Sequence, residues 1–141
     1  MKQVNYALKL ASEAYKNANY DIWALPPTLR VVRLIDQLDF EVTLGGVLGW
    51  LVNMGDRGPE TTKALEAVGA YQCAAIVREI MAFFPEGSPA VKDQERVIQI
   101  MDVEDVAEPR WSELGDRLLS WPDDIYVLLQ KFINEHEADF T

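Results

Sequence analysis

The sequence predicts an all-α fold, a single compact domain of about seven helices over residues 1–141. Three observations predict it. Apolar residues recur at spacings of three and four, the period of a helix face, through most of the chain. No long run alternates between polar and apolar residues, so neither strands nor hairpins are expected. A chain of 141 residues with 49% hydrophobic residues suits one domain with a real core, and disorder is not expected.

The first helix is expected over residues 3–18, where apolar residues fall on one face. The pair Pro26-Pro27 follows a break in this pattern, and a second helix is expected over residues 29 to about 43. Gly45 and Gly46 mark the end of that helix or a bend into residues 47–52. Since these six residues are apolar on nearly every side, they predict a buried central segment.

Residues 53–58 are typical of a loop, and Pro59 fits the first turn of a helix that stops near Gly69. An apolar helix then covers residues 70–84 until Pro85 ends it. Ser88 followed by Pro89 predicts the start of the next helix, which continues to Met101.

The acidic segment 102–110 contains Pro109 and is predicted to be a connection between helices. A short helix is expected over residues 111–119. Ser120 and Asp123 match the capping box, a pattern of Ser or Thr followed three residues later by an acid, and predict the start of the last helix.

The acidic residues are concentrated at one end of the chain. Residues 93–141 contain thirteen Asp and Glu against four Lys and Arg, whereas residues 1–92 contain ten acids against nine bases. The balance is therefore −9 in the last third and −1 in the rest. Such a field attracts basic protein surfaces and repels phosphate, so direct binding to nucleic acid is not expected. Binding to an anionic membrane is also disfavoured.

The chain offers little material for catalysis. His136 is expected to be an exposed residue of the tail, Ser88 lacks the pattern of an activated nucleophile, and Cys73 lies in an apolar run that predicts a buried thiol. The glycines near residue 45 do not form a phosphate-binding loop, and the acids do not match a calcium loop. We therefore expect neither an enzyme nor a bound cofactor or metal.

A single cysteine cannot form an internal disulfide, and this fits a reducing compartment. No stretch approaches eighteen apolar residues, and the N-terminus has no apolar core of a signal peptide. These features predict a cytoplasmic protein, either a monomer or a homodimer.

The acids of the last third are the candidate partner-binding residues. Acids three or four positions apart lie on one side of a helix and can present spaced negative charge. An alternative is a solvated face that only maintains solubility. The candidates are Asp102, Glu104, Asp105, Glu108, Glu113, Asp116, Asp123 and Asp124.

Several short motifs resemble those of a bacterial domain-of-unknown-function family whose best-known member is a DNA mimic. They are residues 41–46 (EVTLGG), residues 50–53 (WLVN), the turn at 84–89 (FPEGSP) and residues 124–126 (DIY). The resemblance covers roughly residues 36–140. Leu44 departs from it, because the family usually has Asn before the two glycines. The resemblance implies an all-α fold, no catalysis and, for the characterised member, binding to the DNA-binding surface of a transcription factor.

Three functions fit these observations. The first is an acidic interaction protein that occupies the basic surface of a DNA-binding protein as a DNA mimic. The second is an immunity-type inhibitor of a toxin or enzyme. The third is an enzyme with an unfamiliar carboxylate site in a cleft near Gly45 to Asp56.

Overall fold

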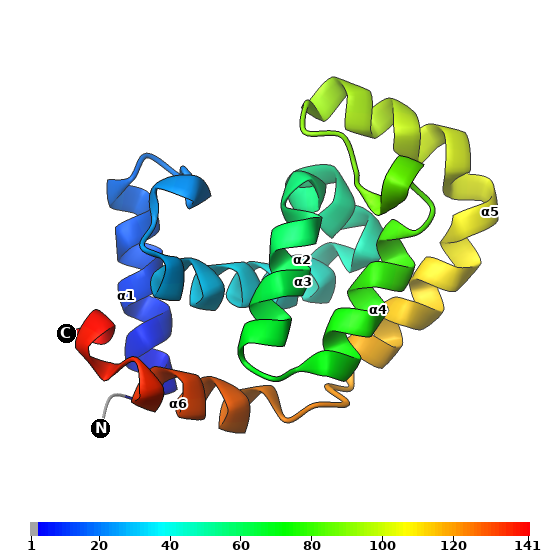
Figure 1. The fold of residues 1–141 in the computed structure, drawn as a ribbon. Helices are drawn as coiled ribbons and strands as arrows, with labels where there is room; N and C mark the ends of the chain where they lie inside the picture. The colour runs from blue at the N-terminus through cyan, green and yellow to red at the C-terminus, as the bar shows by residue number, and fades with distance from the viewer. Residues whose placement is uncertain (1–2) are drawn as a thin grey trace.

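The computed structural model describes residues 3–141, and within that range the chain is helical with no strand, which confirms the all-α prediction (Figure 1). The six α-helices are α1 (Val4–Asn17), α2 (Pro27–Met54), α3 (Gly58–Ala67), α4 (Tyr71–Met81), α5 (Asp93–Leu119) and α6 (Ile125–Glu135). Short 3-10 helices are η1 (Ile22–Ala24), η2 (Gly55–Arg57), η3 (Pro85–Gly87) and η4 (Glu137–Phe140). The described part of the chain thus has six α-helices, and the expected number was about seven.

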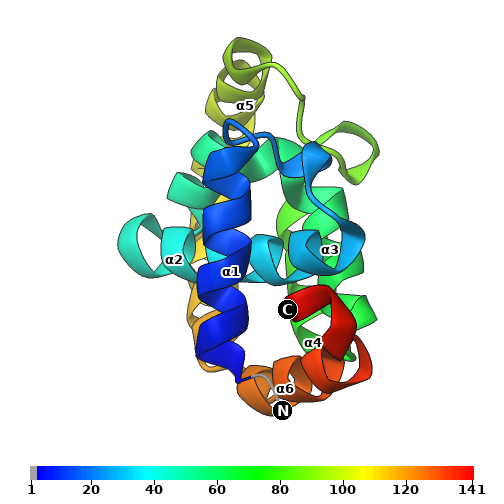
Figure 2. The ribbon, with the colours of Figure 1, turned by 90° about the vertical axis from the view of Figure 1, so that its left-hand side faces the viewer.

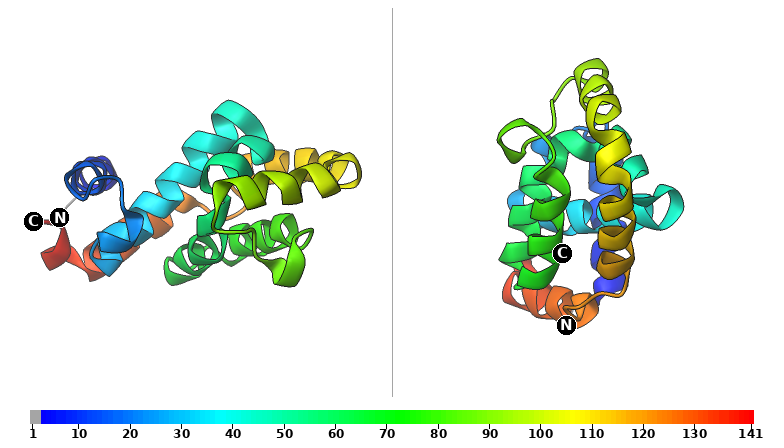
Figure 3. Two further views of the ribbon diagram at one scale, coloured as in Figure 1. Left: turned by 90° about the horizontal axis from the view of Figure 1, so that it is seen from above. Right: turned by 90° about the vertical axis from the view of Figure 1, so that its right-hand side faces the viewer.

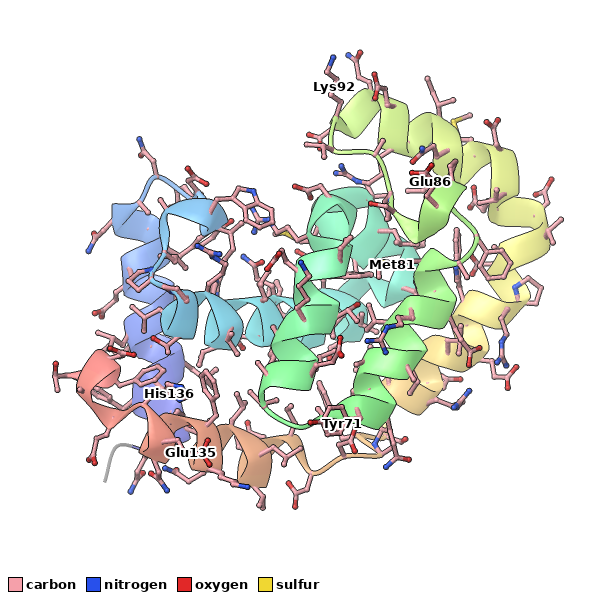
Figure 4. The ribbon with its side chains drawn as sticks, in the orientation of Figure 1. Tyr71, Met81, Glu86, Lys92, Glu135 and His136 are labelled. Carbon is pink, nitrogen blue, oxygen red and sulfur yellow. The ribbon has the colours of Figure 1, made fainter. Side chains whose placement is uncertain are left out.

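Helix α2 is the centre of the molecule and crosses it from one side to the other (Figure 1). Its first half packs against α1, and its second half contacts α3 and α5. Helices α3 and α4 form a pair beside α5, and α6 returns along the bottom to contact α1 (Figure 2). The end of α6, marked by Glu135 and His136, lies at the same end of the molecule as α1 (Figure 4).

The bend that the two glycines predict lies at Gly46. Its backbone angles, φ 69° and ψ −173°, are non-helical and lie in the region that favours glycine. Val42 on one side of the bend, and Val47 and Trp50 on the other, are buried in the core. The prediction of a buried segment after the bend is only partly correct, because Val52 is exposed.

The predicted connection at residues 102–110 is wrong, because α5 is one helix of 27 residues that includes Pro109. Pro109 is exposed, so the carbonyl of Asp105, which loses its helical partner, faces water. The helix curves along its length (Figure 1). One inward stripe at spacings of three and four holds the whole helix against the core: Arg96, Ile100, Val103, Ala107, Trp111, Leu114 and Leu118.

Two predicted helix starts are also wrong. Ser88 lies in the extended chain after η3, and α5 begins at Asp93, after Lys92, which makes no side-chain cap (Figure 4). The capping box of Ser120 and Asp123 does not form. The hydroxyl of Ser120 donates to the carbonyl of Arg117, and Asp124 caps α6 by accepting from the Val127 amide at 3.3 Å.

Arg96 fixes the start of α5 to the end of α2. Its side chain is fully buried, and its guanidinium donates to the carbonyls of Leu51 and Val52, both at 2.8 Å. It also donates to the carbonyls of Ala90 and Val91 and to the carboxylate of Asp93. A charged residue thus takes an inward position because all of its donors have acceptors.

Within residues 3–141, no helix combines the length and the apolar character that crossing a bilayer requires.

Candidate functional site

The structure separates the eight candidate acids into three groups. Two groups lie on α5, one of four acids and one of Glu104 and Glu113, and the third, Asp123 and Asp124, lies in the connection between α5 and α6. Helix α5 runs the height of the molecule on its right-hand side, with no other helix in front of it (right panel of Figure 3).

Five of the six candidate acids on α5 are exposed, and four of these form what we call the acidic face: Asp102, Asp105, Glu108 and Asp116. Asp105, Glu108, Ser112 and Asp116 follow one another at spacings of three, four and four, so they share one side of the helix. Within residues 3–141 none of the four carboxylates makes a hydrogen bond or an ion pair. Their charge is therefore directed at solvent or at a partner.

Glu104 and Glu113 contribute less to this face. Glu104 is half-buried on the inward side of the helix. Glu113 forms an ion pair with Arg110 at 2.9 Å, and Arg110 also pairs with Glu79 of α4. Its hydrogen bond to Glu79, and to a smaller extent its hydrogen bond to Glu113, raise the pKa of the Arg110 guanidinium. Much of the charge of Glu113 is thus neutralised within the molecule.

Asp123 and Asp124 cap helices. The carboxylate of Asp123 accepts from the Cys73 amide at 2.9 Å and from the Gln72 side chain at 3.2 Å, at the N-terminal end of α4. Asp124 caps α6. A carboxylate at a helix N-terminus satisfies free N–H groups and complements the helix dipole, so both residues have structural roles.

A groove of about 230 Å³ lies beside the acidic face, between the bend of α2 and the second half of α5. Gly45, Gly46 and Leu48 line it from α2, and Glu108, Ser112 and Asp116 line it from α5. Further lining is apolar and comes from Val42, Val47, Trp111 and Leu119. The two glycines singled out in the sequence therefore meet the acids at one site.

Apolar side chains are exposed beside the acids. Ile98 is 60% exposed and Met101 is 69% exposed, and both lie on the same side of α5 as Asp105. Leu44, at the bend of α2 next to the groove, is 71% exposed. The sequence did not predict these residues as surface features, because it predicted a shorter helix that ends at Met101. If the inward stripe of α5 had been followed as far as Leu118, it would have predicted that both side chains lie on the outer, exposed side of the helix.

The residues considered for catalysis have other roles. Burial raises the pKa of the Cys73 thiol to about 11, so this thiol is an inert part of the core. His136 is half-buried against the ring of Phe132, whose backbone carbonyl lies 2.8 Å from Nδ1, so the expected full exposure is not found. Across residues 3–141 no group of three His, Cys, Asp or Glu side chains could hold a metal.

The hypothesis of an enzyme with a carboxylate site requires a cleft, and two cavities in the structure could correspond to it. In the groove, Glu108 and Asp116 are exposed, whereas that hypothesis needs buried acids. A second cavity, of about 220 Å³, is lined by Asp36 and Glu41. Burial raises the pKa of Asp36, with Arg33 opposing and Asp39 adding to the shift, but Asp36 is bound to Arg33 at 3.3 Å. Glu41 accepts from the Asn53 side chain at 2.9 Å, so both acids already have partners.

Comparison with known proteins identifies the family of the chain. Comparison with curated proteins and with solved structures finds no match. A family model described as DMP19-like protein matches residues 24–136, which include the bend of α2 and all of α5. The matched region is most of the chain and contains nearly all of the segment in which the sequence motifs were found. The chain therefore belongs to the DMP19-like protein family.

Proposed function

We propose that this protein is a non-catalytic DNA mimic whose acidic face binds the basic surface of a DNA-binding protein. The observation that carries the proposal is the row of carboxylates on the outer side of α5, none of which is neutralised by another described residue. Membership of the family supports it, and so does the concentration of negative charge in the last third of the chain.

The composition of the face favours a contact surface over one that only maintains solubility. A solubilising face is polar throughout, whereas here Ile98 and Met101 are exposed beside Asp102 and Asp105. Exposed apolar groups beside charge are typical of protein interfaces, where the centre is apolar and the rim is polar.

The acidic face carries less charge than the DNA that it would replace. From Asp102 to Asp116 the helix axis advances about 21 Å. B-DNA presents about twelve phosphates over that length, at one charge per roughly 1.7 Å. The face presents four carboxylates, so the apolar side chains must supply part of the binding energy.

This difference predicts how salt shifts the competition with DNA. Binding of proteins to DNA releases condensed counterions and can weaken by about 10³- to 10⁵-fold between 50 and 200 mM salt. A face with one third of that charge releases fewer ions, so its complex is screened but weakens less steeply. We expect the protein to displace DNA from its partner more effectively at 200 mM than at 50 mM salt.

The test is affinity capture at low and moderate salt, followed by mass spectrometry. The wild-type chain is compared with a triple variant, Asp105→Lys, Glu108→Lys and Asp116→Lys. A second triple variant, Glu13→Lys, Glu86→Lys and Glu135→Lys, is the control, because it changes the net charge from −10 to −4 as the first one does but at exposed sites on other elements.

The expected result is a DNA-binding protein that the wild type and the control capture, that the first variant loses and that duplex DNA displaces. Capture of a toxin or another enzyme in place of a DNA-binding protein would identify an immunity-type inhibitor and overturn the proposal. Equal capture by both triple variants would exclude the acidic face as the contact.

A further inference from the structure

The groove beside the acidic face has the size and chemistry of a receptor for one basic side chain. Its volume of about 230 Å³ is below the roughly 300–1,000 Å³ typical of pockets for cofactors and drug-sized ligands. A single long side chain is the kind of group that fills a space of this size.

The charged groups of the groove select a cation. Glu108 and Asp116 stand four residues before and four residues after Ser112, so each lies about 5–6 Å from it at Cβ. A cation placed over Ser112 is therefore within reach of both carboxylates and of the hydroxyl oxygen. No basic residue lines the groove, so neither carboxylate is neutralised there.

Val42, Val47 and Leu119 supply apolar lining to the same groove. A methylene stem packs well against such residues while its charged end stays with the acids. Guanidinium is more weakly hydrated than ammonium and binds carboxylates through two parallel hydrogen bonds. Both properties favour arginine over lysine in a site that is partly apolar.

Gly45 gives independent support for an open groove. A Cβ atom added at Gly45 would meet nothing within 4 Å, so close packing does not require glycine at this position. Its backbone does not require glycine either, since its φ lies outside the left-handed region that Gly46 occupies. Because Gly45 lines the groove, its lack of a side chain leaves the space free on the side of α2.

We propose that this groove receives one arginine side chain from the basic surface of the partner. The inference rests on the proposed function, because it names an anchor point within that contact. It explains why the glycine motif of α2 and the acids of α5 belong to one surface.

The groove can be tested without the partner. The probe is an arginine blocked at both ends, titrated into isotope-labelled protein while the amide NMR spectrum is recorded. The expected shifts centre on Gly45, Gly46 and Ser112, and blocked lysine should bind more weakly. In the double variant Glu108→Gln, Asp116→Asn, the affinity should fall about tenfold, as expected for the loss of two exposed ion pairs.

A neutral variant separates the groove from the general field. Gly45→Leu keeps the net charge and places a side chain in the open space, so the shifts at Ser112 should disappear. Asn5→Leu, at an exposed position of α1, is the control and should bind as the wild type does. Thermal unfolding of each variant shows that it is folded, and Gly45→Ala provides a smaller change at the same position.

Amide shifts that spread over all the acids and do not change in Gly45→Leu would overturn the proposal of an arginine site in the groove. Such shifts would show that arginine is attracted only by the general negative charge. Absence of any shift would overturn it as well, and equal binding of lysine would overturn the choice of arginine. These results differ from failure of the proposed function. In that case arginine still binds the groove, but affinity capture recovers no DNA-binding protein.

Discussion

Replacing Arg96 with alanine should destabilise the protein strongly. Without the guanidinium, the buried carbonyl of Leu51 keeps only the Gly55 amide as a donor, and the loss of a hydrogen bond from a charged group costs about 1.5–3 kcal/mol. The carbonyls of Val52 and Val91 belong to exposed residues and can bind water. Removing a fully buried side chain of this size adds about 2 kcal/mol or more for the space left behind. The expected loss in the free energy of unfolding is about 3–5 kcal/mol.

Urea denaturation followed by tryptophan fluorescence measures this loss. Arg117→Ala, an exposed arginine on the same helix, is the matched control and should change stability by less than about 0.5 kcal/mol. Arg96→Lys should fall between the two, because one ammonium cannot reach all of the acceptors. If Arg96→Ala unfolds within about 1 kcal/mol of the wild type, the network does not hold α5 to α2 and the reasoning is wrong.

Two further changes test the roles assigned to Asp123 and Cys73. Asp123→Ala should lower the free energy of unfolding by about 1–2 kcal/mol, since it leaves the first turn of α4 uncapped, and Asp123→Asn should lower it less. Burial raises the pKa of Cys73 from 9.0 to about 11, so the folded state keeps a proton that the unfolded state loses between these values. The free energy of unfolding should therefore fall as pH rises from about 9 to 11, and it should fall less in Cys73→Ala.

Both measurements can go against the structure. If Asp123→Ala unfolds at the same midpoint urea concentration as the wild type, the carboxylate of Asp123 does not stabilise α4. Parallel loss of stability with pH in the wild type and in Cys73→Ala, measured by thermal unfolding, would show that the thiol does not ionise later in the folded state.

The sequence predicted the elements whose signals are local. The bend at Gly46 and the helix from Gly58 to its stop near Gly69 follow from glycine and proline chemistry within a few residues. Cys73 was correctly expected to be buried, because its neighbours are apolar. The family was also found from short motifs, and its model matches residues 24–136.

The predictions that failed depend on distant contacts. A stretch with Pro109 and several acids resembles a loop when it is read alone. It is recognised as part of a helix only if Arg96 is known to begin the inward stripe. The acceptors that hold Arg96 inward lie 44 and 45 positions earlier in the chain. Asp123 resembles a local capping residue, yet it caps a helix that begins about fifty positions away. Spacing along the chain carries no information about such partners.

The same limitation explains why the site was only half visible in the sequence. The acids of α5 and the glycines of α2 were assigned to separate roles, one to the surface and the other to the scaffold. They meet because Gly115 lets α5 approach the bend. A Cβ atom at that position would lie 3.1 Å from Cγ2 of Val47, so Val47 would have to shift by a few tenths of an ångström to admit it. The charge pattern alone describes a surface that attracts any cation. The close approach of the two helices adds a groove of defined shape, and under the proposed function we expect this groove to distinguish one basic partner from another.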